Sequence, residues 1–236
     1  MPDGAENPYG VHPSPHALLQ IWFSPAFPVG AFAYSHGLEK AVEFGFVRDR
    51  ATLQDWLAEL VAHGGLRNDL ILLAAAWTAI TRADDAGLAE AAALSVAFQP
   101  SAERYLETTQ QGGSFLLQIR SAWPCAAVTK LAAVAPGPVG YPVAAGVAAA
   151  GHGVPLAALL SAYGLGFIGN LTAAAIRLSV VGQSDGQRII ASLLPAIELA
   201  AQYAATATTD DLGGAAFRSD IASLAHETQY TRLFRS

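Results

Sequence analysis

Cysteine is almost absent from this sequence: Cys125 is the one cysteine among 236 residues. A single cysteine excludes an internal disulfide and a Cys-x-x-Cys pair for zinc or redox chemistry. The expected location is therefore a reducing compartment. Because the residues beside Cys125 include no histidine or other base that would lower the pKa of its thiol, we interpret it as a buried core thiol.

Charged residues are also scarce. Asp, Glu, Lys and Arg make up 14% of the chain, against about 25% in an ordinary soluble domain. Much of the surface is therefore expected to be neutral or covered, which favours an oligomer or a subunit of a complex. The net charge of -6 and the presence of only two lysines, Lys40 and Lys130, argue against a nucleic-acid partner, because phosphate binding needs clustered basic side chains.

The sequence also lacks common catalytic signatures. Neither lysine follows a glycine, so there is no phosphate-binding G-x-x-x-x-G-K-[ST] loop, and any nucleotide chemistry would belong to a partner. There is no G-x-S-x-G motif that would present a nucleophilic serine. The chain therefore lacks these two catalytic motifs, and no cofactor is expected.

Residues 131–176 contain no Asp, Glu, Lys or Arg, and a membrane span needs about 20 apolar residues. Four prolines interrupt this run, and much of the rest is Ala and Gly, which are only weakly hydrophobic. We expect buried central helices and no membrane contact; an integral membrane protein is the competing interpretation. At the other end, Asp3 and Glu6 stand where a secretory signal would be basic, so residues 1–16 are expected to form a flexible leader.

Helical patterns dominate the rest of the chain. In "DRATLQDWLAELVAHGG" the apolar residues follow one helical face, Thr52 and Asp55 resemble a capping box, and Gly64 and Gly65 end the helix. A helix ending near Phe44 precedes it, with Gly45 as the left-handed residue and Phe46 folding back. Further helices are expected at about 69–82, 86–98, 102–122, 143–150, 155–180 and 185–207, the last capped by Ser184 or Asp185.

These patterns predict an all-α fold, because few alternating Val, Ile or Thr runs remain to form a sheet. No linker divides the chain. We expect one bundle of roughly eight to ten helices over residues 17–209, followed by a tail at 210–236.

The segment "GLGFIGN" matches the spacing of a dinucleotide-binding fingerprint through Gly164, Gly166 and Gly169, and Asp185 stands at the distance of a ribose ligand. A true fingerprint follows a β-strand, whereas the preceding residues are rich in Leu and Ala. We interpret these glycines as points where two helices approach closely or where one helix breaks.

Two segments carry candidate functional residues. In "SPAFPVGAFAYSHGLE" (24–39), His36 and Glu39 would share one helical face, and His226 with Glu227 offers a second pair for a shared or transient metal site. The tail ends with Tyr230, Leu233 and Phe234 at helical spacing, flanked by Arg232 and Arg235. Such a stripe is expected to dock either on its own domain or in a groove of a partner.

Three long stretches carry a family resemblance: "SPAFPVGAFAYSHGLEKAVEFGFV" (24–47), "AAIRLSVVGQSDGQRIIASLLP" (174–195) and "DIASLAHETQYTRLFRS" (220–236). From about Leu18 to Ser236 the sequence is similar to the urease accessory protein F family. The resemblance implies a cytoplasmic, all-α homodimer that is not an enzyme. It also implies that the protein binds a second accessory protein (D or H) and a GTPase (G), modulates the GTPase as a scaffold on apo-urease, and so supports nickel insertion.

The resemblance also implies partner-binding residues. The tail from Asp220 to Ser236 would become ordered against the D/H partner, and Pro25, Pro28 and Gly30 would fix the entry of the helix that follows. The residues expected to contact partners are Tyr34, His36, Glu39, Arg177, Gln183, Asp185, Asp220, His226, Glu227, Gln229, Tyr230, Arg232, Leu233, Phe234 and Arg235.

One departure from the family pattern Arg-Leu-x-Pro-Leu-Gly-Gln is that Val180 replaces the proline. Loss of a proline would permit the preceding helix to continue toward Gly182. Arg177, the one charge between Leu131 and Ser184, is expected to be paired or to contact a partner, because an unpaired guanidinium in apolar surroundings is costly.

The scaffold interpretation makes one direct prediction, and one alternative function remains open. Deleting residues 220–236 should abolish binding to the D/H partner and leave helicity nearly unchanged. The alternative function is a nickel carrier that holds the metal itself through His36, Glu39 and His226.

Overall fold

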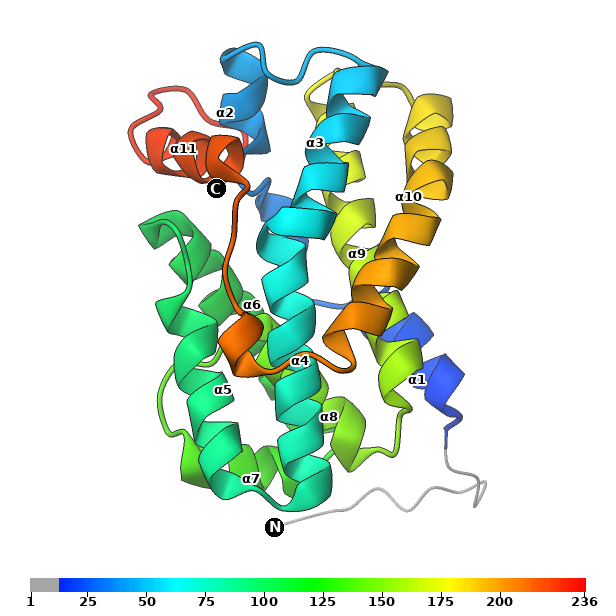
Figure 1. Cartoon of the computed structure of the whole chain (residues 1–236), viewed down its shortest axis with the longest axis vertical. Coiled ribbons are helices and arrows are strands. Elements are labelled where there is room, and N and C mark those ends of the chain that lie inside the picture. The colour runs from blue at the N-terminus through cyan, green and yellow to red at the C-terminus, as the bar shows by residue number, and fades with distance from the viewer. Residues whose placement is uncertain (1–12) are drawn as a thin grey trace.

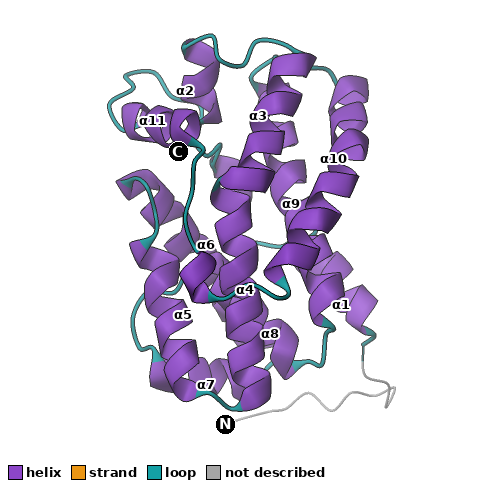
Figure 2. Ribbon diagram, in the orientation of Figure 1, coloured by secondary structure: helices purple, strands orange, loops and turns teal. Residues whose placement is uncertain are grey.

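The computed structural model describes residues 13–236, so most of the expected leader lies outside the described residues. These residues form helices and loops without a β-strand (Figure 2), which confirms the all-α prediction. The helices are α1 (Pro15–Trp22), α2 (Leu38–Glu43), α3 (Arg50–His63), α4 (Gly65–Arg82), α5 (Asp85–Ala97), α6 (Ala102–Ala122), α7 (Ala126–Val134), α8 (Tyr141–Gly151), α9 (Leu156–Arg177), α10 (Gln183–Ala204) and α11 (Phe217–His226), with 3₁₀ turns at Ala31–Ala33 and Thr209–Asp211.

The α4 helix forms the centre of the bundle. It follows α3 along the long axis of the molecule and packs against α3, α5, α8 and α9 (Figure 1). Its apolar residues Leu70, Ile71, Leu72 and Leu73 are almost completely buried. At the top of the view, α2 and the C-terminal helix α11 lie side by side.

The charge-free region 131–176 forms the end of α7, the buried α8 and most of α9. By length and composition α9 could cross a membrane, but half of its most apolar window is buried inside the bundle, where it packs on α10 and α4. A Cβ atom on Gly164 would lie 2.7 Å from the Ile197 side chain of α10. This confirms the interpretation that this glycine allows two helices to approach closely.

Most predicted helices are present, but several ends differ. The residue that caps α3 is Asp49, whose carboxylate accepts the Thr52 amide at 2.9 Å, so the predicted Thr52–Asp55 box is wrong. The α10 helix begins after Gly182 without a side-chain cap, in place of the expected Ser184 or Asp185. The end of α2 is as predicted: Gly45 has φ 73°, and the Phe46 amide donates back to the Ala41 carbonyl at 2.9 Å.

The expected continuation of α9 toward Gly182 is wrong. The helix ends at Arg177, because Ser179 adopts a left-handed conformation with φ 61°. The Val180 amide then donates to the Ala175 carbonyl at 3.0 Å. A proline at 180 could not make this bond, so the valine stabilises the turn and does not lengthen the helix.

Candidate functional site

The stretch 24–39 is an irregular segment whose path depends on positive φ angles. His36 and Gly37 have φ angles of 56° and 75°, and α2 begins only at Leu38. A Cβ atom on Gly37 would lie 2.8 Å from the Ser223 amide of α11. This glycine therefore permits both the turn and the close approach of α11.

The prediction that His36 and Glu39 share a helical face is consequently wrong, because His36 precedes the helix. The His36 side chain turns to Glu107 of α6, with Nε2 2.7 Å from the carboxylate. Glu39 turns to the C-terminal segment. The two residues therefore serve different contacts.

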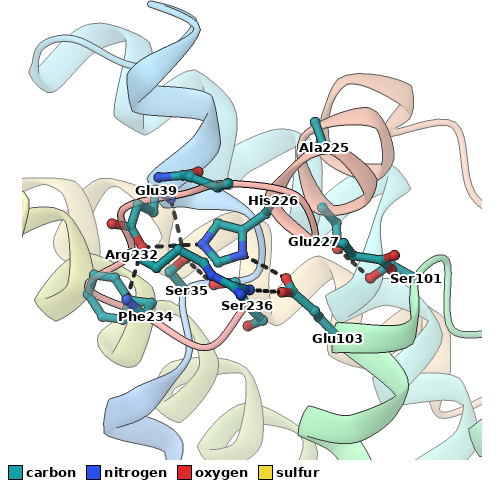
Figure 3. A network of polar contacts seen from close by, with 12 residues as sticks. Ser35, Glu39, Ser101, Glu103, Ala225, His226, Glu227, Arg232, Phe234 and Ser236 are labelled. Atoms are coloured by element: carbon teal, nitrogen blue, oxygen red, sulfur yellow. Dashed lines mark hydrogen bonds and ion pairs between the residues drawn. The ribbon is translucent and has the colours of Figure 1, made fainter.

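Glu39 holds the C-terminal segment by its backbone. One carboxylate oxygen accepts the Leu233 amide at 2.7 Å and the other accepts the Phe234 amide at 2.9 Å. The second oxygen also lies 3.2 Å from Nε2 of His226. Figure 3 shows Glu39 facing both the tail and His226.

His226 connects three parts of the chain. Its side chain is completely buried, and its Nδ1 atom lies 2.7 Å from the Glu103 carboxylate of α6. The other Glu103 oxygen accepts a guanidinium N–H from Arg232 at 2.6 Å. Beside this network, Glu227 accepts the Ala102 amide at the start of α6 at 2.8 Å (Figure 3). We call Glu39, Glu103, His226 and Arg232 the tail clamp.

Beyond the clamp, the end of the described chain is buried. Phe234 is 3% exposed and Ser236 is 0% exposed. The Ser236 hydroxyl donates to Glu107 at 2.8 Å, and its carbonyl accepts the Ser35 amide at 3.0 Å and the Ser35 hydroxyl. Of the apolar tail residues, Phe234 therefore docks on its own chain, whereas Tyr230 and Leu233 are exposed, and docking in a partner's groove stays a prediction.

Next to Ser236, the side chains of Arg104, Glu107 and Gln111 of α6 form a buried polar cluster. Glu107 pairs with the Arg104 guanidinium and accepts the Gln111 amide at 3.1 Å. Burial alone would raise the pKa of Glu107, but Arg104 and His36 outweigh it and lower the pKa to about 2. Burial, followed by the Arg104 charge, lowers the pKa of His36 below its usual value.

The cluster lies between two cavities. The larger, of about 1010 Å³, is lined by most of residues 19–32 together with parts of α6 and α9. The smaller, of about 140 Å³, lies near the start of α4 and α11. His36, Asp69 and Arg104 line both.

Arg177 has no acidic partner among residues 13–236. Its guanidinium lies 3.8 Å from the centre of the Phe32 ring and 4.3 Å from that of Phe234, and it donates to the Phe32 carbonyl at 2.6 Å. Burial lowers its pKa below the usual value. Cation–π contacts and a carbonyl thus replace the expected ion pair, and the contact with a partner stays a prediction.

The structure brings together some of the predicted site residues and separates others. Tyr34 and Arg235 both meet Gln110 beside the tail. By contrast, Asp185 pairs with Arg188 at the exposed start of α10, next to the exposed Gln183. The remaining tail residues Asp220, Gln229, Tyr230 and Leu233 do not join the clamp by their side chains, and Tyr230 is 101% exposed.

The partner residues on α6 were not predicted from the sequence. Glu103, Glu107 and Gln111 follow at intervals of four residues and therefore lie on one helical face. That row of polar side chains in an apolar chain was the available signal. It does not reveal that the face is buried, because the covering segments come from the two ends of the described chain.

The interpretation of Cys125 also needs correction. Cys125 is only partly buried, and His152, at the end of α8, lies close enough to its thiol to affect the pKa. Burial raises the pKa of the thiol, but His152 and backbone amides of α7 outweigh it, so the pKa lies below its usual value. The base was missed because it comes from another helix.

Substitution of Glu39 tests the clamp. In Glu39→Gln the amide NH₂ group would face a backbone N–H, and loss of a charged hydrogen bond costs about 2 kcal/mol. We expect trypsin to cleave after Arg232 about 30-fold faster, because the rate follows the open population. Glu43→Gln, an exposed change on the same helix, is the control; equal rates in both variants would contradict the clamp.

The comparisons with known proteins agree with one another. A sequence model of the UreF family matches residues 47–194. The chain is 52% identical over 218 residues to a urease accessory protein UreF of Methylobacterium radiotolerans, covering 92% of this chain and 95% of that protein. It is 51% identical over 218 residues to the protein of that name from Methylorubrum populi, covering 92% and 97%. A third, from Rhodopseudomonas palustris, is 47% identical over 237 residues and is covered completely, as is this chain.

Proposed function

Because the chain belongs to the UreF family of urease accessory proteins, we propose that it is a non-enzymatic scaffold for urease maturation. In this proposal it acts in the cytoplasm as a homodimer. It binds the accessory protein D or H and the GTPase G, and it docks with them on apo-urease. There it modulates GTP hydrolysis that is coupled to nickel insertion, and it needs no cofactor of its own.

The observation that carries this proposal is that the C-terminal segment has a fixed backbone and exposed apolar side chains. The tail clamp and the buried Phe234 fix its backbone, while Tyr230 and Leu233 remain 101% and 63% exposed. Exposed apolar side chains on a fixed backbone lose little entropy when a partner binds, and tyrosine is enriched among the residues that dominate interface energies. The tail therefore has the properties of a preorganised docking surface for the D/H partner.

The nickel-carrier alternative finds less support. His36 binds Glu107, whereas His226 lies between Glu39 and Glu103. Within residues 13–236, no group of three or more His, Cys, Asp or Glu side chains is placed to hold a metal ion. The candidate ligands thus act as hydrogen-bond partners that position the tail.

Light scattering coupled to size exclusion tests the scaffold. The full-length protein is measured alone, with the D/H partner, and with both the partner and the GTPase, in the presence and absence of GTP. We expect a stable species that contains all three proteins. If the protein elutes unchanged in every mixture, the proposal is wrong.

A point substitution in the tail tests the docking surface. Leu233→Ala should weaken binding to the D/H partner about 30-fold, because a residue central to an interface contributes about 2 kcal/mol or more. Leu117→Ala removes a leucine of nearly equal exposure, 62% against 63%, from the C-terminal half of α6. Isothermal titration calorimetry of both variants gives the affinities, and equal loss or no loss would contradict a docking role for Leu233.

Single substitutions test partner binding more specifically than deletion of residues 220–236 does. That deletion would remove most of α11 together with the buried Phe234 and His226. Loss of partner binding could then follow from exposure of the core. The expectation that helicity stays nearly unchanged remains a prediction for circular dichroism.

A further inference from the structure

The larger cavity combines aromatic walls with a buried carboxylate. The rings of Phe23 and Tyr163 lie 5.8 Å apart, and those of Tyr163 and Tyr141 lie 5.4 Å apart. All three residues line the cavity, together with Trp22 and Asp69. A cavity of about 1010 Å³ is the size of pockets that hold small organic molecules.

Asp69 lies beside the middle ring of this row, that of Tyr163. It lies on α4, is 7% exposed, and accepts the Tyr163 hydroxyl at 2.9 Å. Among the described residues it has no ion pair within 4.0 Å. Burial raises its pKa to about 6, against the opposing effects of Arg104 and the Tyr163 hydrogen bond.

The charges around Asp69 leave an excess of negative charge. Arg104 and Glu107 on α6 pair with each other, and His36 is neutral near pH 7 because its pKa is lowered. The hydroxyls of Tyr163 on α9 and Tyr141 on α8 remain protonated, since burial raises both pKa values. Arg104 is thus one arginine beside two carboxylates, Asp69 and Glu107. Asp220 of α11, which lines the smaller cavity with Asp69 and Arg104, is a third acidic group nearby, so the region carries an excess of negative charge.

A negatively charged group beside aromatic faces selects a particular kind of ligand. Aromatic rings attract cations through their negative faces, and this attraction is strongest when water is excluded. A metal ion would require several oxygen, nitrogen or sulfur ligands, whereas most of the walls are apolar. An anion would be repelled by the Asp69 carboxylate, which has no ion-pair partner among the described residues.

We propose that this cavity binds a small organic cation of the alkylammonium class, with its cationic head against Tyr141 and Tyr163 and with Asp69 as the counter-ion. Most of residues 19–32, a range that includes more than half of the Pro- and Gly-rich stretch, form one wall of the site. This gives that stretch a role apart from partner binding.

Calorimetric titration of the full-length protein with choline tests the site. The neutral isostere 3,3-dimethylbutan-1-ol has the same shape and is the matched probe. We expect choline to bind with a stoichiometry of one and about tenfold more tightly than the isostere, as a desolvated cation–π contact implies. Equal affinities for the two probes, or no binding of choline, would overturn the proposal.

Two variants locate the binding. Asp69→Asn keeps an oxygen acceptor for Tyr163 and should reduce choline affinity about tenfold, whereas Tyr163→Phe keeps the ring and should change the affinity little. Thermal melts establish that both are folded. If choline binds both variants and the native protein equally, the site is elsewhere and the proposal fails.

The remaining tests are choline titrations at different pH values and a titration with nickel chloride. Choline binds the ionised form of Asp69, so its affinity should fall between pH 7.5 and pH 5, as that carboxylate becomes protonated near pH 6. Nickel chloride replaces choline in a parallel titration. Nickel binding that is lost in Asp69→Asn, without choline binding, would show a metal site and overturn the proposal.

Discussion

Replacing Gly112 with alanine is expected to lower the free energy of unfolding by about 3 kcal/mol, the cost of severe overpacking. Gly112 lies where α6 crosses the start of α8. A Cβ atom there would lie 2.2 Å from the Val139 carbonyl oxygen and 3.1 Å from the Tyr141 amide. These are backbone atoms, so no side-chain rotation relieves the clash and the two helices must separate.

The neighbouring glycine provides the control. A Cβ atom on Gly113 meets nothing within 4 Å, so Gly113→Ala should raise the free energy of unfolding by up to about 1 kcal/mol through helix propensity. Both variants gain the same propensity, and the difference between them isolates the helix contact. Urea denaturation followed by circular dichroism measures it; equal stabilities would show that α6 and α8 are less closely packed than described.

Replacing Arg104 with methionine should lower the free energy of unfolding by about 3 kcal/mol, because it leaves the Glu107 carboxylate buried without its main counter-charge. The two side chains are 8% and 2% exposed. Methionine retains the length of the side chain, so the loss reports mainly the charge. The hydrogen bond from His36 to Glu107 remains, which places the expected cost at the lower end for a broken buried pair.

An exposed pair with the same spacing provides the control. Arg188 lies three residues after Asp185 on α10, and their side chains are 66% and 40% exposed. Arg188→Met should change the free energy of unfolding by less than about 1 kcal/mol. If both substitutions cost the same, the buried pair does not contribute as we describe.

The effect of pH separates charge from packing in Arg104→Met. In the native protein the pKa of Glu107 is lowered from 4.5 to about 2, so its contribution is complete above pH 4.5 and is lost as the pH falls through 2. Without Arg104, burial raises that pKa, and the penalty is greatest at neutral pH. The stability difference should therefore narrow as the pH falls from about 5 to about 2; a constant difference would indicate packing alone.

The sequence predicted the helices better than their ends. The apolar spacing of residues 53–61 and the glycine at 45 are local signals, and the structure has the corresponding helix and turn. The end of α9 was mispredicted, because Ser179 adopts a left-handed conformation that its residue type does not favour. Residue preferences give probabilities, and tertiary packing then selects one conformation.

The candidate site was predicted only in part. Residues 24–39 and 220–236 were identified by unusual composition, and Glu39 with His226 does meet the tail. The charge pairs of α6 were missed, since Glu103, Arg104 and Glu107 resemble an ordinary solvated helical face until another segment covers them. Asp69 was missed for the same reason.

The sequence by itself determined an all-α, charge-poor fold of the UreF family, because periodicity, capping residues and family motifs are properties of neighbouring positions. The tertiary structure alone decided which polar groups are buried and with what partners. The contacts of Glu39 with the tail, of His36 with Glu107 and of Cys125 with His152 join residues distant in sequence. Burial of a charge is a property of the packed surroundings and is not encoded in the local sequence around it.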